Sequence, residues 1–570
     1  MRLLNRLNQF QRLWQPSSGA PQQTTVAELA ARCFCSERHT RSLLRQLEAA
    51  GWLSWQAQSG RGKRGTLRFL VTPQSVRASM MEQVLNQGEH HNALTLAQLA
   101  PEQLRHLLTP FLGGQWQNDT PTLRIPYYRP LEPLTPGFLP GRAEQHLAGQ
   151  IFAGLTRFDA ASLRPQGDMA HHWDISSDGL IWRFYLRPTL HWHDGKPVET
   201  GQLLASLNQF LALPALRQLF ASVKAVDSPH AQCLRFTLFR PDYWLAWRLA
   251  SYCSFLAHPQ SNQTGCGPFR LTGFSPELVR LESHEFYHLQ HPLLKAVEYW
   301  ITPLLFDRAL GTSCRHPVQI ALGQEEELAN LRPISNSVSL GFCYLGVRQG
   351  GRLSPAQARR LISLIRESGM IEALPLDEGL ITPSREMLPG WALPLWTPEA
   401  VTLPPRLTLF YHLPVELHVM AQQLREQLAI LGCELTVHFH DAKNWDGCGE
   451  LDSADIVMGD RLIGEAPEYT LEQWLRCDAL WPHLLTPSQQ HHLHATLDSV
   501  QRYPDDETRN TALKAVFYEL MSDGVITPLF NYRYQISAPP GINGVELNAR
   551  GWFDFTRAWL PPPVSGEEAG

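Results

Sequence analysis

Apolar residues recur every three to four positions over the first fourteen residues of the chain. Leu3, Leu7, Phe10 and Leu13 would lie on one side of a helix, with Arg, Asn and Gln between them, which is typical of an amphipathic helix. These polar residues also interrupt the continuous apolar run that a secretory signal needs. No stretch approaches the roughly 18 uncharged apolar residues of a membrane span. We therefore expect a cytoplasmic protein.

The next pattern predicts two helices joined by a short turn. Thr25 and Glu28 have the spacing of a capping box, in which each side chain accepts a hydrogen bond from the backbone N–H of the other residue. This first helix should end near Cys33–Cys35. Ser36 is a favourable N-cap for a second helix, and Gly51 suits the end of that helix.

The second predicted helix has an apolar side and a basic side. At about 100° per residue its leucines fall together, whereas Arg38, Arg41 and Arg45 lie on the opposite side with Ser42 among them. A solvated helix usually carries charges of both signs on its outer face. This basic stripe, defined as Arg38, Arg41, Ser42 and Arg45, is predicted to have one sign only.

Two segments of alternating apolar and polar residues, 52–58 and 66–72, predict a β-hairpin after the second helix. Its glycines would permit positive φ angles and close approach to another molecule. The tip of the hairpin is rich in glycine and basic residues: Gly60, Arg61, Gly62, Lys63, Arg64 and Gly65. A helix-turn-helix followed by such a hairpin is typical of a winged helix domain, whose second helix enters the major groove of double-stranded DNA. A nucleotide-binding loop is excluded, because no Gly-Lys-Ser/Thr run opens a helix here; an ordinary flexible loop is the alternative.

Charge is distributed unevenly along the 570 residues. Residues 1–72, the predicted winged helix domain, hold eleven Lys and Arg against three Asp and Glu, a net charge of +8, so residues 73–570 carry −13 of the total of −5. This asymmetry indicates a basic anion-binding module attached to an acidic body, with a solvated charge run as the alternative. Cys33 and Cys35 have no partner pair at the spacing of zinc ligands, and neither a metal nor a cofactor is expected.

The remaining chain divides into three parts. Amphipathic patterns in residues 73–119 predict a small helical connector, and they leave open a surface for a homodimer. From residue 120 to 562, strand and helix patterns alternate with turn signals, as in an α/β domain. One of these turns places Gly179 where a positive φ is expected. Residues 563–570 should form a disordered tail.

Residues 36–70, SERHTRSLLRQLEAAGWLSWQAQSGRGKRGTLRFL, resemble the N-terminal domain of the SgrR-type transcriptional regulators and their enterobacterial paralogues. The resemblance implies base contacts from Arg38, Thr40, Arg41 and Arg45. Arginine suits guanine and phosphate alike, so which side chain touches a base stays open. Together with the wing, the candidate DNA-binding residues are Ser36, Arg38, Thr40, Arg41, Ser42, Arg45, Arg61, Lys63, Arg64 and Arg68.

A second resemblance covers residues 120–310. Ser177-Asp178-Gly179-Leu180, His193-Asp194-Gly195, TGCGPFRL at 264–271 and HPLLKAVEYWI at 291–301 are similar to the signature of oligopeptide- and dipeptide-type solute-binding proteins. This resemblance implies a two-lobed fold that closes on a small ligand. The expected fold class is therefore multidomain: an N-terminal winged helix (α+β) followed by a two-lobed α/β domain like the type II periplasmic binding proteins.

The same resemblance suggests where a ligand would bind. In the segment GEAPEYTLEQWL, Glu465 would stand for the acidic residue that anchors a peptide amino group in those proteins. The candidate ligand-binding residues are Glu465, Tyr469 and Trp391, with Glu465 as a plain surface residue being the alternative. The periplasmic members begin with a signal peptide where this chain has a winged helix domain. The ligand class stays open between a sugar, a sugar phosphate and a short peptide.

Motifs of enzymes are weak in this chain. The His-rich segment QQHHLH at 489–494 lacks the His-Glu-x-x-His spacing of a zinc peptidase, and no Gly-x-Ser-x-Gly sequence occurs. We expect no enzyme but a ligand-responsive, DNA-binding regulator of transcription, whose partners are double-stranded DNA and a small molecule, with no membrane. Two alternatives remain: the solute-binding-like domain is a ligand-free interaction platform, or the chain is a solute- or peptide-binding protein linked to transport.

Overall fold

The computed structural model divides the chain into two compact units. One comprises Met1–Phe111 with Trp300–Leu305, and the other comprises Leu112–Tyr299 with Phe306–Gly570. None of the described helices is long and apolar enough to span a membrane. The structure describes residues 2–15, 19–58, 63–117, 119–306, 318–319, 332–333, 338–374, 381–397, 400–534, 536–538 and 541–563.

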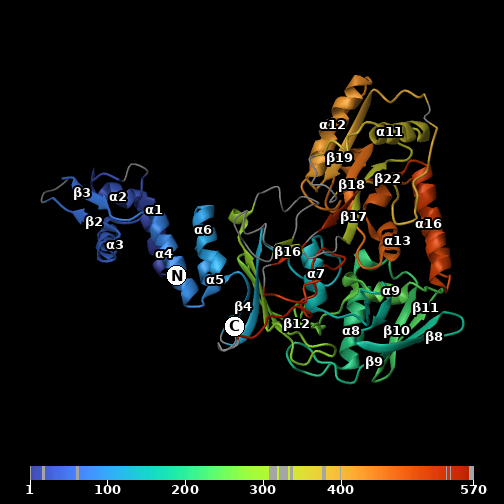
Figure 1. Ribbon diagram of the computed structural model, residues 1–570, viewed down its shortest axis with the longest axis horizontal. Coiled ribbons are helices and arrows are strands. Elements are labelled where there is room, and N and C mark those ends of the chain that lie inside the picture. Colours follow the sequence, from blue (N-terminus) through green and yellow to red (C-terminus); the bar gives the residue numbers. More distant parts are fainter. Residues whose placement is uncertain are drawn as a thin grey trace, which may run out of the picture. The chain divides into compact units, whose positions relative to one another are not determined.

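The first unit begins with a winged helix-turn-helix (Figure 1). Its three-stranded antiparallel sheet has the order β1-β3-β2. The elements of this unit are α1 (Arg2–Leu13), β1 (Gln22–Thr24), α2 (Val26–Cys33), α3 (Glu37–Ala49), β2 (Leu53–Gln56), β3 (Gly65–Phe69), α4 (Pro73–Asn86), α5 (His90–Leu94) and α6 (Pro101–Leu108).

The helices of the winged helix domain begin and end where the sequence predicts. The Thr25 hydroxyl accepts the N–H of Glu28 and the Glu28 carboxylate accepts the N–H of Thr25, so the capping box is confirmed. Helix α2 ends at Cys33, and Ser36 caps α3 by accepting the N–H of His39. Gly51 follows α3 with a φ of 73°.

One core holds α1 against the helix-turn-helix and the wing. Leu7, Phe10 and Leu13 are fully buried, which confirms the predicted amphipathic helix. The Phe10 ring lies 5.3 Å from that of Trp52 and 5.7 Å from that of Phe69. Each such buried side chain contributes about 1.5–3 kcal/mol of hydrophobic stabilisation, so α1 is held against the strands of the wing.

β2 and β3 form the predicted hairpin, with Leu53 opposite Phe69. The positive φ expected for Gly65 is wrong, because Gly65 is not among the glycines with left-handed backbone. Its lack of a side chain serves packing instead: a Cβ there would lie 2.6 Å from the Trp55 ring. Gly60, Arg61 and Gly62 at the tip lie outside the described residues.

Three helices, α4 to α6, follow the wing within the range predicted to be a helical connector. Thr72 caps α4, and Pro73 occupies its first turn, where a missing N–H costs nothing. Met81 of α4 and Leu104 of α6 are buried. The chain becomes extended at Gly113, where β4 begins.

The second unit has two lobes, drawn mainly in green and in yellow to red in Figure 1. The first lobe contains a five-stranded sheet of order β12-β13-β14-β5-β4, a four-stranded sheet of order β10-β11-β9-β8, and the hairpin β6–β7. Gly179, between β8 and β9, has the predicted positive φ, at 72°. The elements are β4 (Gly113–Gln117), β5 (Thr120–Tyr127), α7 (Arg142–Ile151), β6 (Thr156–Phe158), β7 (Pro165–Gly167), β8 (Ala170–Ile175), β9 (Ile181–Leu186), α8 (Thr200–Leu211), β10 (Val223–His230), β11 (Cys233–Leu238), α9 (Leu245–Ala250), β12 (Phe269–Phe274), β13 (Leu278–Ser283) and β14 (Ala296–Ile301).

The second lobe is built on a six-stranded mixed sheet of order β18-β22-β17-β21-β19-β20. Side chains alternate across it: Phe342 and Tyr344 of β17 join one core, and Cys343 and Leu345 join the other. The elements are β17 (Val338–Val347), α11 (Pro355–Glu367), β18 (Ile381–Pro383), β19 (Arg406–His412), α12 (Glu416–Ile430), β20 (Glu434–His440), β21 (Ile456–Leu462), α13 (Pro467–Cys477), α14 (Leu480–Leu484), α15 (Pro487–Val500), α16 (Asp506–Ser522) and β22 (Ile526–Tyr534).

After β22 the chain returns to the first lobe. The Trp552 and Phe555 rings lie 5.4 and 4.8 Å from the His146 ring of α7. A small sheet is formed by connecting segments, namely β15 (Val318–Gln319), β16 (Arg332–Pro333) and β23 (Ile536–Ala538). Most of the predicted tail, from residue 564 onwards, lies outside the described residues.

Candidate functional site

Helix α3 exposes the predicted basic stripe. Arg38, Arg41, Ser42 and Arg45 are all exposed. The stripe is not of one sign, however, because the Glu37 carboxylate lies 2.8 Å from the Arg41 guanidinium, one helical turn away. Both side chains of this pair are about half exposed, so the pair is weak. Arg38 and Arg45 form no ion pair within the described ranges.

Thr40 lies on the other side of α3. It is fully buried, and its hydroxyl donates to the Ser36 carbonyl at 3.1 Å. Helical spacing explains this burial. Thr40 precedes the buried Leu43, Leu44 and Leu47 by three, four and seven residues, so it lies on the same side of α3. Thr40 is therefore unavailable to a base in this structure, contrary to the contact that the family resemblance implies.

The wing presents Lys63, Arg64 and Arg68 as exposed side chains. Arg64 lies 3.2 Å from Glu28 of α2, again in an exposed pair. Arg61 lies outside the described residues. The remaining candidate, Ser36, uses its hydroxyl to cap α3.

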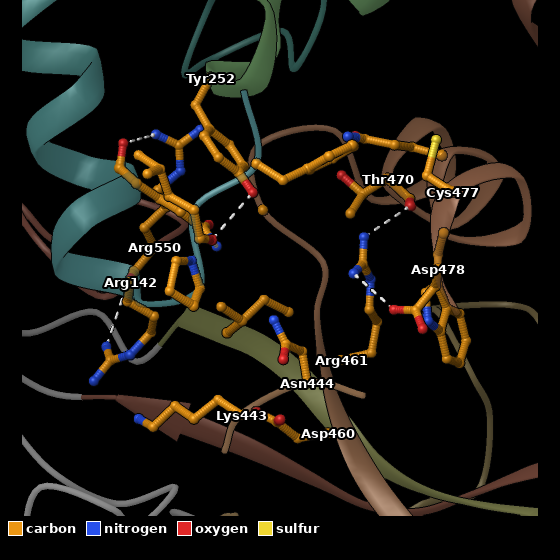
Figure 2. A pocket seen from close by; sticks show the side chains of 18 of the residues that line it. Arg142, Tyr252, Lys443, Asn444, Asp460, Arg461, Thr470, Cys477, Asp478 and Arg550 are labelled. Carbon is orange, nitrogen blue, oxygen red and sulfur yellow. Dashed lines mark hydrogen bonds and ion pairs between the residues drawn. The ribbon is translucent and has the colours of Figure 1, made fainter. Parts of the chain in front are cut away.

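A cleft of about 540 Å³ lies between the two lobes of the second unit. This volume suits a small organic ligand. The first lobe contributes residues that include Arg142 and Tyr252, and the second contributes residues that include Lys443, Asp460 and Arg461 (Figure 2). Charged groups of both signs and several aromatic rings thus face the same space.

Glu465 lies in this cleft, but its carboxylate already has a cationic partner. Arg550, in the segment that returns to the first lobe, donates to it at 3.0 Å. Arg550 also donates to the Gln145 carbonyl at 3.2 Å and accepts through its own carbonyl from Arg142 at 3.2 Å. The role of Glu465 as an anchor for a ligand's amino group stays a prediction, and a ligand would have to share the carboxylate with Arg550 or displace it.

Asp460 is a second carboxyl group of the cleft, on β21. It accepts a hydrogen bond from the Tyr532 hydroxyl at 3.1 Å. Burial raises the pKa of Asp460 to about 6, while the nearby cations Lys443 and Arg461 act in the opposite direction. Asp460 thus lies at the wall of the cleft with a raised pKa, and Figure 2 shows Lys443 on the same side.

Arg461, the next residue on β21, turns toward the other end of the cleft. It approaches the Asp478 carboxylate at 4.0 Å and donates to the Thr470 carbonyl at 3.5 Å (Figure 2). Burial raises the pKa of Asp478. The Trp474 ring lies beneath Arg461, 5.7 Å from the guanidinium carbon.

Tyr469 and Trp391, the other two predicted ligand residues, lie in different places. Tyr469 is buried and lines the cleft, where the Arg248 guanidinium carbon lies 6.0 Å from its ring. Trp391 is also buried, but it lines a separate cavity of about 450 Å³ beside Lys514. The structure therefore brings Glu465 and Tyr469 together and leaves Trp391 outside the cleft.

A buried ion-pair network joins the lobes behind the cleft. Arg248 of α9 donates to Asp242 at 2.9 Å and to Glu472 of α13 at 2.8 and 2.9 Å, and all three side chains are fully buried. Arg476 also contacts Glu472, and it donates to Gln501 at 2.9 Å. Arg476 also donates to Asp498 at 3.0 Å, so the two buried arginines are balanced by two buried carboxylates and by a third that is partly exposed.

Comparisons with known proteins cover both parts of the chain. Residues 5–119 match the family described as "Sugar transport-related sRNA regulator N-term", and residues 164–305 match "Bacterial extracellular solute-binding proteins, family 5 Middle". Over 576 residues the chain is 31% identical to the HTH-type transcriptional regulator SgrR of Yersinia enterocolitica, covering 97% of this chain and 98% of that protein. The chain belongs to the SgrR family.

Further similarities agree with this membership. The SgrR-family chain is 66% identical over 564 residues to the Escherichia coli K12 protein "Uncharacterized protein YbaE", covering 99% of this chain and all of that one. NikA of Brucella suis, in complex with Fe(III)-EDTA, aligns with a TM-score of 0.62 at 14% identity, over 77% of this chain and 100% of NikA. A Pseudoalteromonas dipeptide-binding protein with Met-Leu gives 0.61 at 14% identity, with the same coverage. At such identities the likeness shows the fold alone, and it confirms the predicted two-lobed architecture.

Several residues of the cleft in this SgrR-family chain were not among the predicted ligand residues. Arg142 lies on α7, Lys443 follows β20 and Asp460 lies on β21, so no helix or strand periodicity connects them. Asp460 does follow the apolar run Ile456–Met458 on a buried strand, a position where a carboxylate needs a partner. That signal was available in the sequence.

Proposed function

We propose that this SgrR-family protein is a cytoplasmic DNA-binding transcriptional regulator that responds to a small solute bound in its interlobe cleft. The observation that carries the proposal is the combination in one chain of exposed arginines on α3 and a two-lobed domain with a cleft of about 540 Å³. A regulator that senses no ligand would account for the arginines of α3 but not for the cleft. A binding protein that does not bind DNA would account for the cleft but not for the arginines.

In this proposal α3 enters the major groove and the wing lies along the phosphates. Arg38 and Arg45 are available at once, and Arg41 and Arg64 exchange their partners Glu37 and Glu28 for phosphate groups. Because both of these pairs are solvent-exposed, breaking them costs little.

A ligand changes DNA affinity only if it binds two conformations of the protein differently. Closure of the lobes over a solute would bring Lys443 and Asp460 of the second lobe toward Arg142 and Tyr252 of the first. The buried network around Arg248 and Glu472 then acts as a fixed point about which the lobes move, because separating those charges would leave them unpaired in the interior.

A second candidate function is supported by the pairing of Glu465 with Arg550. If these residues lock the cleft, the two-lobed domain is a ligand-free platform for interactions. A thermal-shift screen with sugars, sugar phosphates and short peptides separates the two candidates. A ligand at 100 times its Kd stabilises the protein by about 2.7 kcal/mol, whereas a locked platform shows no shift with any of them.

The regulator function itself is tested by mapping the genomic sites that the full-length protein occupies in cells. We expect discrete sites upstream of genes, and the products of those genes would indicate the ligand class. Purified protein that binds no duplex even at low salt would contradict the proposal, because phosphate contacts are strongest there.

A further inference from the structure

Phe34 occupies the turn of the helix-turn-helix in a conformation that an aromatic residue rarely adopts. Its φ and ψ are 51° and 45°, in the left-handed region, where glycine is the usual residue. Steric crowding at the Cβ makes this conformation unfavourable for other residues. The ring is also 84% exposed, so burial in the winged helix domain does not offset this cost.

The direction of the ring is fixed by the backbone around it. The N–H of Phe34 donates to the Ala31 carbonyl at 3.3 Å, and the N–H of Cys35 donates to the Ala30 carbonyl at 3.1 Å. Ser36, the next residue, caps α3. Phe34 therefore projects from a rigid turn, two residues before the N-cap of the helix that carries the basic stripe.

One cation contacts this exposed ring, and further arginines follow it in sequence on α3. The guanidinium carbon of Arg12 lies 5.5 Å from the ring centroid, and Arg12 also donates to the Cys33 carbonyl at 3.4 Å. Arg38 lies in the first turn of α3, and it is exposed. The nearby carboxylate, Glu37, is paired with Arg41. A ring in contact with a guanidinium group, at the start of a helix with exposed arginines, favours an anionic partner.

This charge pattern selects between the partners that an exposed aromatic ring can have. A second copy of the chain would bring the same arginines to a symmetric interface, where like charges repel. Double-stranded DNA brings phosphates for the arginines. In its major groove the apolar group on the base edges is the C5-methyl group of thymine, with which phenylalanine makes contact in other complexes.

We propose that Phe34 is a specificity-determining residue that contacts a thymine methyl group at the edge of the site read by α3. The inference rests on the proposed DNA-binding function and deepens it by naming a base. The turn conformation positions the ring, and the Arg12 guanidinium contacts it.

The test uses the full-length protein and duplexes that the wild type selects from a random pool. Each duplex is prepared with thymine and with deoxyuridine, which lacks the methyl group. For Phe34→Gly we expect roughly tenfold weaker binding to the thymine duplex, no change in the salt dependence, and little further loss on the deoxyuridine duplex. Leu70→Ser is the matched control, since Leu70 is another exposed apolar residue of this domain, at 53%, and it should bind as the wild type does.

Glycine relieves the strained backbone, so Phe34→Gly should keep at least the wild-type hydrogen-exchange protection of α2 and α3. A folded Phe34→Gly variant that binds both duplexes as tightly as the wild type overturns the inference, as does an equal loss on both duplexes. In either case, weaker DNA binding by Arg38→Ala would still support the proposed DNA-binding function. A wild type that selects no duplex at low salt would instead remove the proposed function itself.

Discussion

Arg248 and Glu472 form a doubly hydrogen-bonded ion pair between the two lobes, with N–O distances of 2.8 and 2.9 Å and both side chains fully buried. They are 224 residues apart in the chain. The two arginines of the network, Arg248 and Arg476, hold the pKa of Glu472 down to about 2 despite its burial. The carboxylate is therefore charged at every pH at which the protein is expected to work.

The first prediction is that Glu472→Gln destabilises the second unit strongly. The variant removes the negative charge that Arg248 and Arg476 share. Leaving buried charges without a partner lowers the free energy of unfolding by about 3–5 kcal/mol. The measurement is chemical denaturation followed by tryptophan fluorescence. As a control, Asp227→Asn removes an exposed partner of Arg235 and should leave the midpoint unchanged. Equal stability of Glu472→Gln and the wild type would show that the network does not hold the lobes together.

The second prediction concerns the salt dependence of DNA binding. Arg38→Ala and Arg64→Ala should each weaken binding and reduce the slope of log K against log salt by about 0.9, because each variant loses one phosphate contact. Titrations from low to moderate salt measure this slope. Arg217→Ala, an exposed arginine of the first lobe, is the control and should keep the wild-type slope. Wild-type slopes in both variants would argue against the assigned DNA-binding surface.

The third prediction separates Thr40 from its exposed neighbours on α3. Because the Thr40 hydroxyl bonds to the Ser36 carbonyl inside the domain, Thr40→Val should lower the stability of the winged helix domain by about 1 kcal/mol. Its affinity for DNA, measured well below the unfolding temperature, should stay at the wild-type value. If Thr40→Val lost affinity only for duplexes with particular base pairs, the result would support the base contact that the family resemblance implies.

The fourth prediction concerns pH. The pKa of Asp460 rises from 3.8 to about 6 in the folded protein because of burial, so between these values the folded state holds more protons than the unfolded chain. This contribution to stability is fully present below about pH 4 and is lost as the pH rises through about 6. Asp460→Asn should flatten that part of the stability curve.

Tyr532→Phe provides the complementary variant for this pH effect. Loss of the Tyr532 hydroxyl removes the hydrogen bond that favours the charged carboxylate of Asp460. The pKa of Asp460 should then rise further, so the decrease in stability should extend to higher pH. Unfolding midpoints between pH 4 and 7 measure both variants. Identical curves for the wild type and Asp460→Asn would show that Asp460 is not the titrating group.

Much of the winged helix domain could be predicted from its sequence. The capping box of Thr25 and Glu28 and the N-cap at Ser36 depend on residues within four positions of one another, so local spacing specifies them. The burial of Leu7 and Phe10 follows from helical periodicity in the same way. Even the burial of Thr40 was available from its spacing to the leucines of α3.

The cleft was decided by the tertiary structure. Glu465 meets Arg550 only because the chain returns to the first lobe after β22, and Trp391 faces a different cavity although it is aromatic and buried like Tyr469. The physical reason is the sequence distance over which each interaction acts. Caps and helix faces are set by backbone geometry over a few residues, whereas the partner of a buried charge depends on how separate segments pack. Sequence spacing determines the former, and only the folded chain determines the latter.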